Sequence, residues 1–303
     1  MQTEPDVRDR PYLNHQDILD LNFTRSPGTF VYRKHYRTGL RSHIMEVLDP
    51  EEVEKETRGV EGDGMMFYPQ AEPLKMLRIF RTRFDSLKDA EEELRRVRIV
   101  QTYLGPDHVA RSQEFLVDYT VQGRQQMLLC GLQEYVKGEV LEPWSYLDKS
   151  YLSSVARDMG TGAGENRAMT DSRWIQVVQE KTENLVTRLK QMVVEAGHVP
   201  DLAGVGNLIL TPTGEIKLVD INNISNVSFD ATIPLDDRGY PVCDKSIRVI
   251  SLLEEKLLGR SVERNDPIYE TFLRPERVKK VKVLEERFHL SMQPDNSFAG
   301  GAC

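Results

Sequence analysis

Three oxygen-bearing side chains are spaced along residues 196–225 in a way that could bind a divalent cation. Asn207 stands before the extended segment 208–212, and Asp220 stands near the end of the extended segment 215–221. A Thr-Gly turn at 213–214 joins these segments and predicts a β-hairpin. The hairpin would hold Asn207 and Asp220 at one end of a rigid ladder, where their oxygens could coordinate Mg²⁺. Asp201, six residues before Asn207, would add a carboxylate able to orient or accept a proton.

Each of these residues also has an ordinary structural explanation. Asp commonly caps a turn, and Asn or Asp commonly begins or closes a strand. The order of the three residues, together with the long helix before them, favours a shared site. That helix is expected over 172–195, where apolar residues recur at helical spacing: Ile175, Val178, Leu185, Leu189, Met192 and Val193.

The first 140 residues predict strand, strand, helix, strand and strand. The first two strands are expected at 64–69 and 72–84, joined by a turn at 70–73. The helix should begin after Ser86 as its N-cap and end at Gly105-Pro106. The next two strands are expected at 114–119 and 126–133. Residues 158–171 are Gly-rich and predict an exposed loop, and helices are expected to resume at about Ser246.

Composition limits the class of protein. A chain of 303 residues exceeds what one hydrophobic core usually fills, so two lobes are expected. Its 40 basic and 48 acidic residues give a charge of -8, which argues against a general nucleic-acid binder or a membrane-surface binder. Three cysteines without a CxxC pair predict neither a disulfide framework nor a zinc site. With no apolar signal segment, a cytoplasmic protein is expected.

The run AGHVPDLAGVGNLILTPTGEIKLVDINNIS resembles the catalytic and metal-binding loops of the protein-kinase-like superfamily, including its bacterial and aminoglycoside-phosphotransferase-like members. The resemblance implies an α+β fold of two lobes, a small β-rich N-lobe with one long helix and a mainly helical C-lobe. It implies Asp201 as the catalytic carboxylate, Asn207 and Asp220 as magnesium ligands, and ATP with Mg²⁺ as cofactors. The family triplet HRD or HGD is VPD here, and its DFG is Asp220-Ile221-Asn222.

The same resemblance assigns residues of the N-lobe. Lys75 is the expected phosphate-binding cation, with Arg78 as a competitor on the same strand. Its expected helix partner is Glu92 or Glu93, which the sequence does not separate. Gly62 and Gly64, with Gly59, are expected to form a Gly-rich phosphate loop.

The resemblance also assigns a hinge and a helix anchor. Glu134, Tyr135 and Val136 are expected to present backbone groups to the adenine edge, and Asp244 is expected to receive backbone amides from the catalytic loop. The implied organisation is an N-terminal extension over 1–45, an N-lobe over 46–136, a C-lobe over 137–291 and a disordered tail over 292–303.

Three functions are compatible with these residues. The first is an active phosphotransferase that moves the γ-phosphate of ATP to a hydroxyl of an unidentified substrate, with no nucleic-acid or membrane partner. The second is a pseudokinase, a nucleotide-binding or scaffolding module with a protein partner, favoured by the VPD triplet, by the one extra residue between Asp201 and Asn207 relative to the family, and by the poor match of the Gly-rich loop. The third is an ATP-grasp-like ligase or nucleotidyltransferase, which also places carboxylates at strand ends. The substrate, the oligomeric state and the role of residues 1–45 are not predicted.

Overall fold

The computed structural model describes residues 5–21, 26, 28–37, 39, 41–121, 123–159, 171–262 and 265–292. The chain is mixed α and β and forms two compact units. Unit 1 comprises Met1–Arg95 with Ala110–Tyr135, and unit 2 comprises Arg96–Val109 with Val136–Cys303. The Gly-rich loop expected at 158–171 and the tail expected at 292–303 lie almost entirely outside the described residues.

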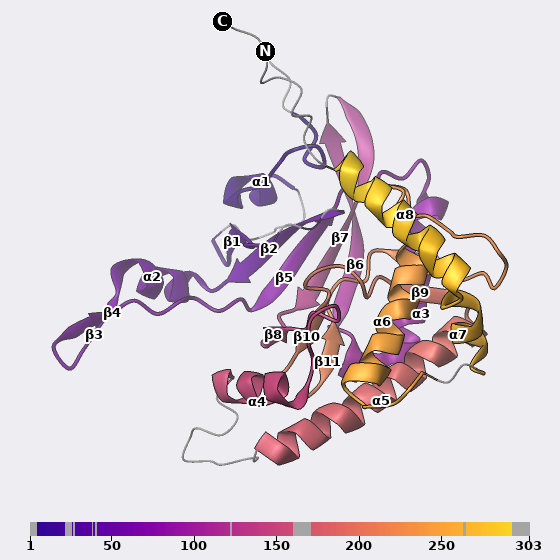
Figure 1. Ribbon diagram of the computed structural model, residues 1–303. Helices are drawn as coiled ribbons and strands as arrows, with labels where there is room; N and C mark the ends of the chain where they lie inside the picture. The colour runs from indigo at the N-terminus through magenta and orange to yellow at the C-terminus, as the bar shows by residue number, and fades with distance from the viewer. Residues whose placement is uncertain are drawn as a thin grey trace, which may run out of the picture. The chain divides into compact units, whose positions relative to one another are not determined.

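Unit 1 is built on a five-stranded antiparallel sheet with the strand order β1-β2-β5-β7-β6 (Figure 1). Its strands are β1 (Val31–Lys34), β2 (Ser42–Leu48), β5 (Lys75–Phe80), β6 (Ser112–Val121) and β7 (Arg124–Glu134). Residues 1–45, expected to be an extension, instead supply β1, the first half of β2 and the short helix α1 (His15–Leu19). The predicted strands at 114–119 and 126–133 are confirmed as β6 and β7.

A helix and a small hairpin are inserted between β2 and β5. They are α2 (Pro50–Arg58), β3 (Val60–Gly62) and β4 (Met65–Phe67). The prediction that β4 pairs with β5 is wrong, because β4 pairs with β3 while β5 lies between β2 and β7. Asp63 and Gly64 adopt positive φ and form a tight turn, so β4 folds back on β3, the strand just before it.

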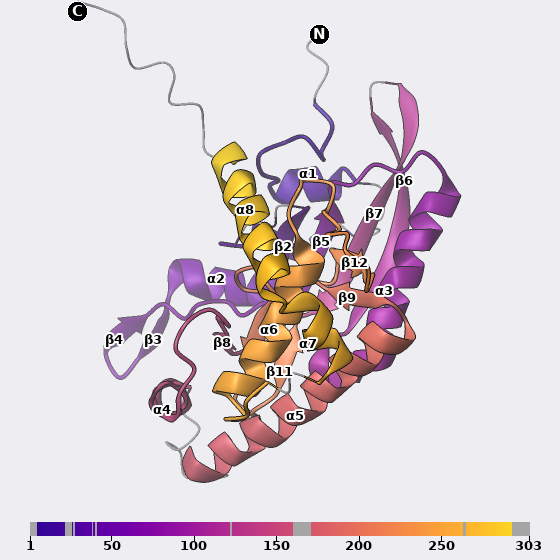
Figure 2. The same cartoon turned by 45° about the vertical axis from the view of Figure 1, so that its right-hand side comes forward.

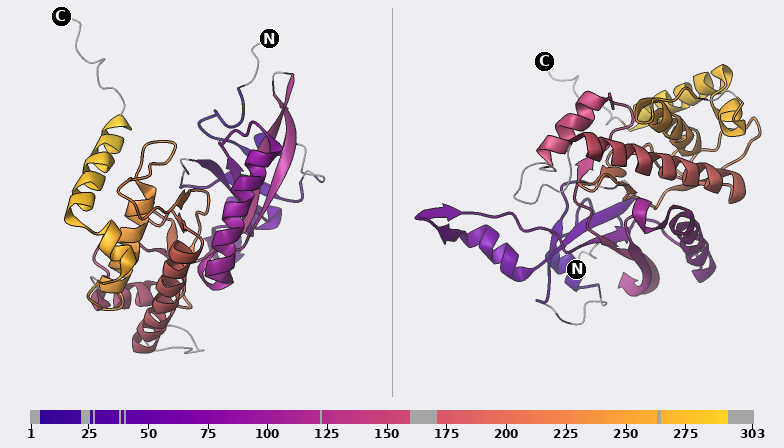
Figure 3. Two further views of the ribbon diagram at one scale, coloured as in Figure 1. Left: turned by 90° about the vertical axis from the view of Figure 1, so that its right-hand side faces the viewer. Right: turned by 90° about the horizontal axis from the view of Figure 1, so that it is seen from below.

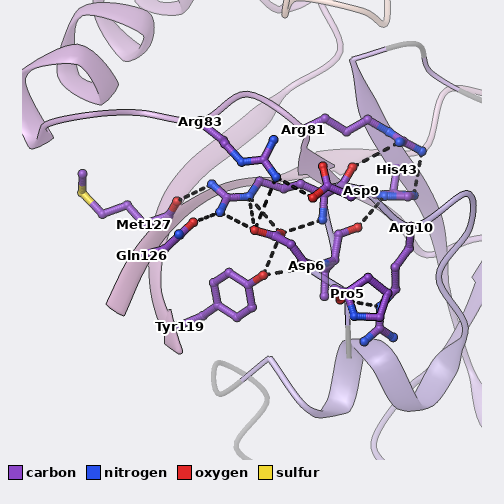
Figure 4. Close-up of polar contacts among 12 residues, drawn as sticks. Pro5, Asp6, Asp9, Arg10, His43, Arg81, Arg83, Tyr119, Gln126 and Met127 are labelled. Carbon is purple, nitrogen blue, oxygen red and sulfur yellow. Dashed lines mark hydrogen bonds and ion pairs between the residues drawn. The ribbon is translucent and has the colours of Figure 1, made fainter. Parts of the chain in front are cut away.

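The N-terminal segment is fixed to the sheet of unit 1 by buried polar contacts (Figure 4). Arg8 forms an ion pair with Asp6 at 2.6 Å, and the Tyr119 hydroxyl donates to Asp6 Oδ1 at 2.7 Å. Burial alone would raise the pKa of Asp6, but the hydrogen bonds from Arg8 and Tyr119 lower it to about 2. Beneath these contacts Leu13 and Ile18 pack on the sheet in a hydrophobic core.

Helix α3 (Leu87–His108) begins in unit 1 and ends in unit 2. Ser86 Oγ accepts from the amide of Asp89 at 3.3 Å, which agrees with the predicted N-cap. Gly105 adopts φ +67 and interrupts the helix where the Gly-Pro pair predicted its end, although one further turn follows.

Unit 2 is mainly helical and contains three short strand pairings (Figure 2). Its helices are α4 (Lys149–Asp158), α5 (Asp171–Glu195), α6 (Val242–Lys256), α7 (Pro267–Phe272) and α8 (Pro275–Ser291). The predicted long helix is confirmed as α5. Its apolar stripe packs on α6 and on the strands in the main core of this unit, with Trp174 and Leu189 fully buried. None of the described helices is both long and apolar enough to span a bilayer.

Candidate active site

A two-stranded ladder in unit 2 positions Asp201. Strand β9 (His198–Pro200) pairs antiparallel with β12 (Ile224–Asn226), and Asp201 follows β9 directly. Beyond the ladder, the Asp201 amide donates to the Asn223 carbonyl at 2.9 Å. The backbone of Asp201 is therefore fixed against the segment that follows Asp220.

The Asp201 carboxylate is held by the loop after it. Its Oδ1 accepts from the amides of Ala203 and Gly204, each at 3.0 Å. Its Oδ2 accepts from Asn223 Nδ2 at 3.4 Å. Three donors thus set the orientation of this side chain.

Asn207 is brought to Asp201 at the start of the predicted hairpin. Strands β10 (Leu208–Leu210) and β11 (Ile216–Leu218) pair antiparallel, as expected, and the amide of Val219 donates to the Asn207 carbonyl at 2.8 Å. Asn207 Nδ2 donates to the Asp201 carbonyl at 2.8 Å. Gly204 allows this contact, because a Cβ there would lie 2.5 Å from Asn207 Nδ2.

Asp220 interacts electrostatically with Asp201. Burial raises the pKa of Asp201 to about 6, and repulsion from Asp220 adds to this rise. The hydrogen bonds from the Ala203 and Gly204 amides act in the opposite direction and lower the pKa. The Asp220 Oδ1 accepts from the amide of Asn222 at 3.1 Å. Two mutually repelling carboxylates make a site that gains from a cation.

Asn223 and Asp236 belong to the same network, and Asn223 was not among the residues expected from the sequence. Asn223 Nδ2 lies 3.4 Å from oxygens of both Asp201 and Asp236. Asp236 is fixed in turn, since its Oδ1 accepts from the amide of Tyr240 at 2.8 Å. In the sequence, only its place directly after Asp220-Ile221-Asn222 could have pointed to Asn223.

Asp244 does not anchor the loop as expected. Its carboxylate forms a buried ion pair with Arg277, with Nε to Oδ1 at 2.5 Å and Nη2 to Oδ2 at 3.0 Å. The loop is anchored instead by Ser246, whose Oγ accepts from the amide of Leu202 at 3.1 Å. A hydroxyl two residues further along α6 takes the expected role, because Arg277 occupies the Asp244 carboxylate.

Arg277 also holds the segment that follows β12. Its guanidinium donates to the carbonyls of Asp230 and Thr232 at 2.8 and 3.0 Å. One arginine of α8 therefore ties together α6 and the segment after β12.

The predicted ion pair in unit 1 is not formed. Lys75 is exposed at the first position of β5, and among the described residues it makes no ion pair. Glu92 binds Arg95 at 2.7 Å. Arg78 is buried on the opposite face of β5 from Lys75, because successive strand residues alternate faces. Because Arg78 is buried, it is the stronger candidate for a cation that its surroundings hold in place. A phosphate-binding role for Lys75, with Glu92 or Glu93 as its partner, stays a prediction.

The expected Gly-rich loop is an exposed hairpin tip. Gly62 ends β3 and Gly64 lies in the turn with φ +76, and a Cβ at either position would meet nothing within 4 Å. No neighbouring atom comes close enough to either position to require a glycine there, so packing gives no support for their expected role at phosphate.

The three expected hinge residues lie where the chain passes between the units. Glu134 ends β7 and lies opposite Lys75 in the antiparallel β5–β7 ladder, and Tyr135 is the last residue assigned to unit 1. Val136 begins the second part of unit 2. Their adenine-binding role stays a prediction.

The donor set at Asp201, Asn207 and Asp220 fits a hard cation. The described residues contain no cluster of three or more His, Cys, Asp or Glu that could hold a metal ion by itself. A cation here would take few protein oxygens and complete its shell with water or phosphate, which is how Mg²⁺ is usually bound.

Comparison with known proteins does not assign the chain. No protein-family model matches it, and no curated protein shows significant similarity to it.

Proposed function

We propose that unit 2 carries the active site of an ATP- and Mg²⁺-dependent phosphotransferase. The single observation that carries the proposal is the buried Asp201 carboxylate, held by loop amides beside Asp220 and Asn207. This is the set of oxygens that phosphoryl transfer requires: one near the accepting hydroxyl and two for the metal.

Asp201 is suited to receive a proton. Burial and Asp220 raise the pKa of its carboxyl to about 6, near the pH at which a cytoplasmic base would work. A carboxylate with an ordinary pKa would be a weaker base. The loop amides keep it oriented while it accepts the proton.

Asn207 and Asp220 would hold Mg²⁺, which when bound neutralises charge on the phosphates. In the reaction the acceptor oxygen forms a bond to the γ-phosphorus, and the bond from this phosphorus to the β,γ-bridging oxygen breaks. The hydroxyl proton passes to Asp201, and ADP leaves. Asn223 and Ser246 position the loop during this step.

The second candidate function is a pseudokinase. The observation that favours it is the Val199-Pro200 pair in β9, which lacks the side-chain donors that brace the loop in the family it resembles. Here Asn223 and Ser246 supply bracing hydrogen bonds instead, so we favour turnover.

The test is ADP formation from Mg·ATP with a panel of small hydroxylated compounds and generic proteins. Asp201→Asn should lower turnover by on the order of 10² to 10⁴ while leaving ATP binding intact. Asp158→Asn, a change at an exposed residue of α4, is the matched control and should behave as wild type.

Two results separate the alternatives. If wild type binds Mg·ATP but neither it nor the variant turns over, the pseudokinase reading replaces the phosphotransferase. If neither protein binds ATP, both proposals are wrong.

A further inference from the structure

The hairpin of β3 and β4 stands out in unit 1 because its apolar side chains are exposed, with no described residue of the unit covering them. It forms a separate two-stranded sheet after α2, and Figure 3 shows it projecting from the remainder of the unit. We call α2 together with this hairpin the arm. An isolated two-stranded hairpin is marginally stable in water, so such an element usually gains its stability from a partner.

The apolar side chains of the arm are exposed. Met65 is 72 % exposed, Phe67 66 % and Tyr68 60 %, and Val60 and Met66 are exposed as well. Val60, Met65 and Phe67 share one face of the hairpin and Met66 lies on the other, and exposed apolar groups of this kind are typical of an interaction site. The arm is also acidic, with seven acidic and two basic residues over 49–68.

The tip of the arm presents a carboxylate. Gly62 pairs with Met65, so Asp63 and Gly64 form a two-residue turn, and their φ values are +51 and +76. Asp tolerates this left-handed conformation better than most residues. The turn therefore places Asp63 at the outermost point.

The same unit carries a surface of opposite charge. A small recess at the start of β2 is lined by the cations Lys34, Arg37 and Arg81 and by His43, whose pKa is lowered by burial and by Arg81, and none of the described residues that line it is Asp or Glu. Arg81 also approaches His43 Nδ1 at 3.5 Å (Figure 4). We call this the basic recess.

Aromatic side chains border the basic recess. Tyr36 is 75 % exposed, with the guanidinium of Arg37 5.2 Å from its ring centre. Tyr12 is exposed as well, and the Lys34 ammonium lies 5.9 Å from its ring. The recess thus offers cations and aromatic surface, which complement an acidic, apolar arm.

An arm cannot readily reach the recess of its own chain. The recess lies at the start of β2 and the arm leaves from its end, so the two are separated by the length of a seven-residue strand, about 23 Å. Figure 1 shows the arm extending away from the sheet at that end. A second copy of the chain presents the same recess without this restriction.

We propose that the chain forms a two-fold dimer in which the arm of each copy packs over the basic recess of the other, with Asp63 facing Lys34. Two-fold symmetry makes this contact twice, which closes the assembly. A stable interface buries about 1,600 Å² in total, so each arm needs to cover about 400 Å². At 66 % exposure Phe67 supplies about 100 to 160 Å² of this area, and Met65 and Val60 on the same face of the hairpin add to it.

The test is the mass in solution, measured by sedimentation velocity over a range of concentrations. Wild type should be a dimer. Asp63→Lys and Lys34→Glu should each weaken dimerisation about 100-fold, since two charge pairs are reversed at about 10-fold each. Asp63→Asn should weaken it less and keep the turn, and Lys88→Glu, an exposed change on α3, should have no effect.

The decisive experiment mixes the two charge-reversed variants, Asp63→Lys and Lys34→Glu. In the mixed dimer, Lys at 63 meets Glu at 34 in one contact, and the wild-type pair forms the other, so the dimer should return. Circular dichroism checks that each variant folds. A monomeric wild type, a dimer unaffected by both reversals, or a mixture that stays monomeric would each overturn the proposal.

Discussion

Replacing Asp201 by Asn should stabilise the protein at neutral pH and lose this effect in acid. The pKa of Asp201 rises from 3.8 to about 6 on folding. Between these values the folded state binds more protons than the unfolded state, so stability falls as pH rises through this window. Above about pH 6 the full penalty applies, and a rise of this size corresponds to about 3 kcal/mol.

The Asn variant removes this penalty and adds a smaller one. Its Oδ1 can still accept from the amides of Ala203 and Gly204, but its Nδ2 would face Asn223 Nδ2 across the 3.4 Å contact. The lost hydrogen bond costs about 1 kcal/mol. The net gain above about pH 7 is then about 2 kcal/mol, or about 4 to 8 °C in Tm for a unit of this size.

The assay is the thermal midpoint of wild type and Asp201→Asn from about pH 4 to pH 8, with the window set by linkage. Asp158→Asn serves as the control and should shift nothing. We expect the Tm difference to grow with pH and to vanish or change sign near the acidic end. A difference that is constant with pH, or a variant less stable at high pH, would refute the reasoning about Asp201.

Three further outcomes follow from named contacts. Gly204→Ala should destabilise by about 1 to 3 kcal/mol in urea unfolding, because its Cβ would lie 2.5 Å from Asn207 Nδ2; an effect near zero would contradict the packing. Arg277→Met should cost about 3 to 5 kcal/mol by leaving Asp244 buried and unpaired, and adding Asp244→Leu should recover much of it; no recovery would argue that Arg277 acts through its carbonyl contacts. Burial and Arg81 lower the pKa of His43 from 6.5 to about 4, so stability should fall as pH drops through this window, and His43→Gln should flatten the fall in a pH series of melting curves.

The sequence predicted elements well where local patterns decide them. The apolar spacing of α5, the Ser86 cap of α3 and the Thr-Gly turn between β10 and β11 each depend on neighbouring residues, and each was found. Strand partners depend on distant residues. β4 and β5 are close in sequence, yet β5 pairs with β2 and β7, which no local pattern specifies.

The candidate site was predicted in part for the same reason. Asp201 and Asn207 belong to one short segment and meet through the Asp201 carbonyl. Ser246 and Asn223 reach the loop from other elements, so their roles depend on packing. The Lys75 assignment followed residue type, whereas burial depends on tertiary packing: Lys75 is exposed at the first position of β5 and Arg78 is buried further along the strand.

We expect Asp220 and Asn207 to hold Mg²⁺ for ATP, and calorimetric titration of ATP with and without Mg²⁺ tests this directly. For wild type we expect binding that tightens at least tenfold with Mg²⁺. Asp220→Ala should lose the Mg²⁺-dependent part and retain the fold by circular dichroism, with Asp158→Ala as the matched control. Equal Mg²⁺ dependence in wild type and Asp220→Ala would contradict the account.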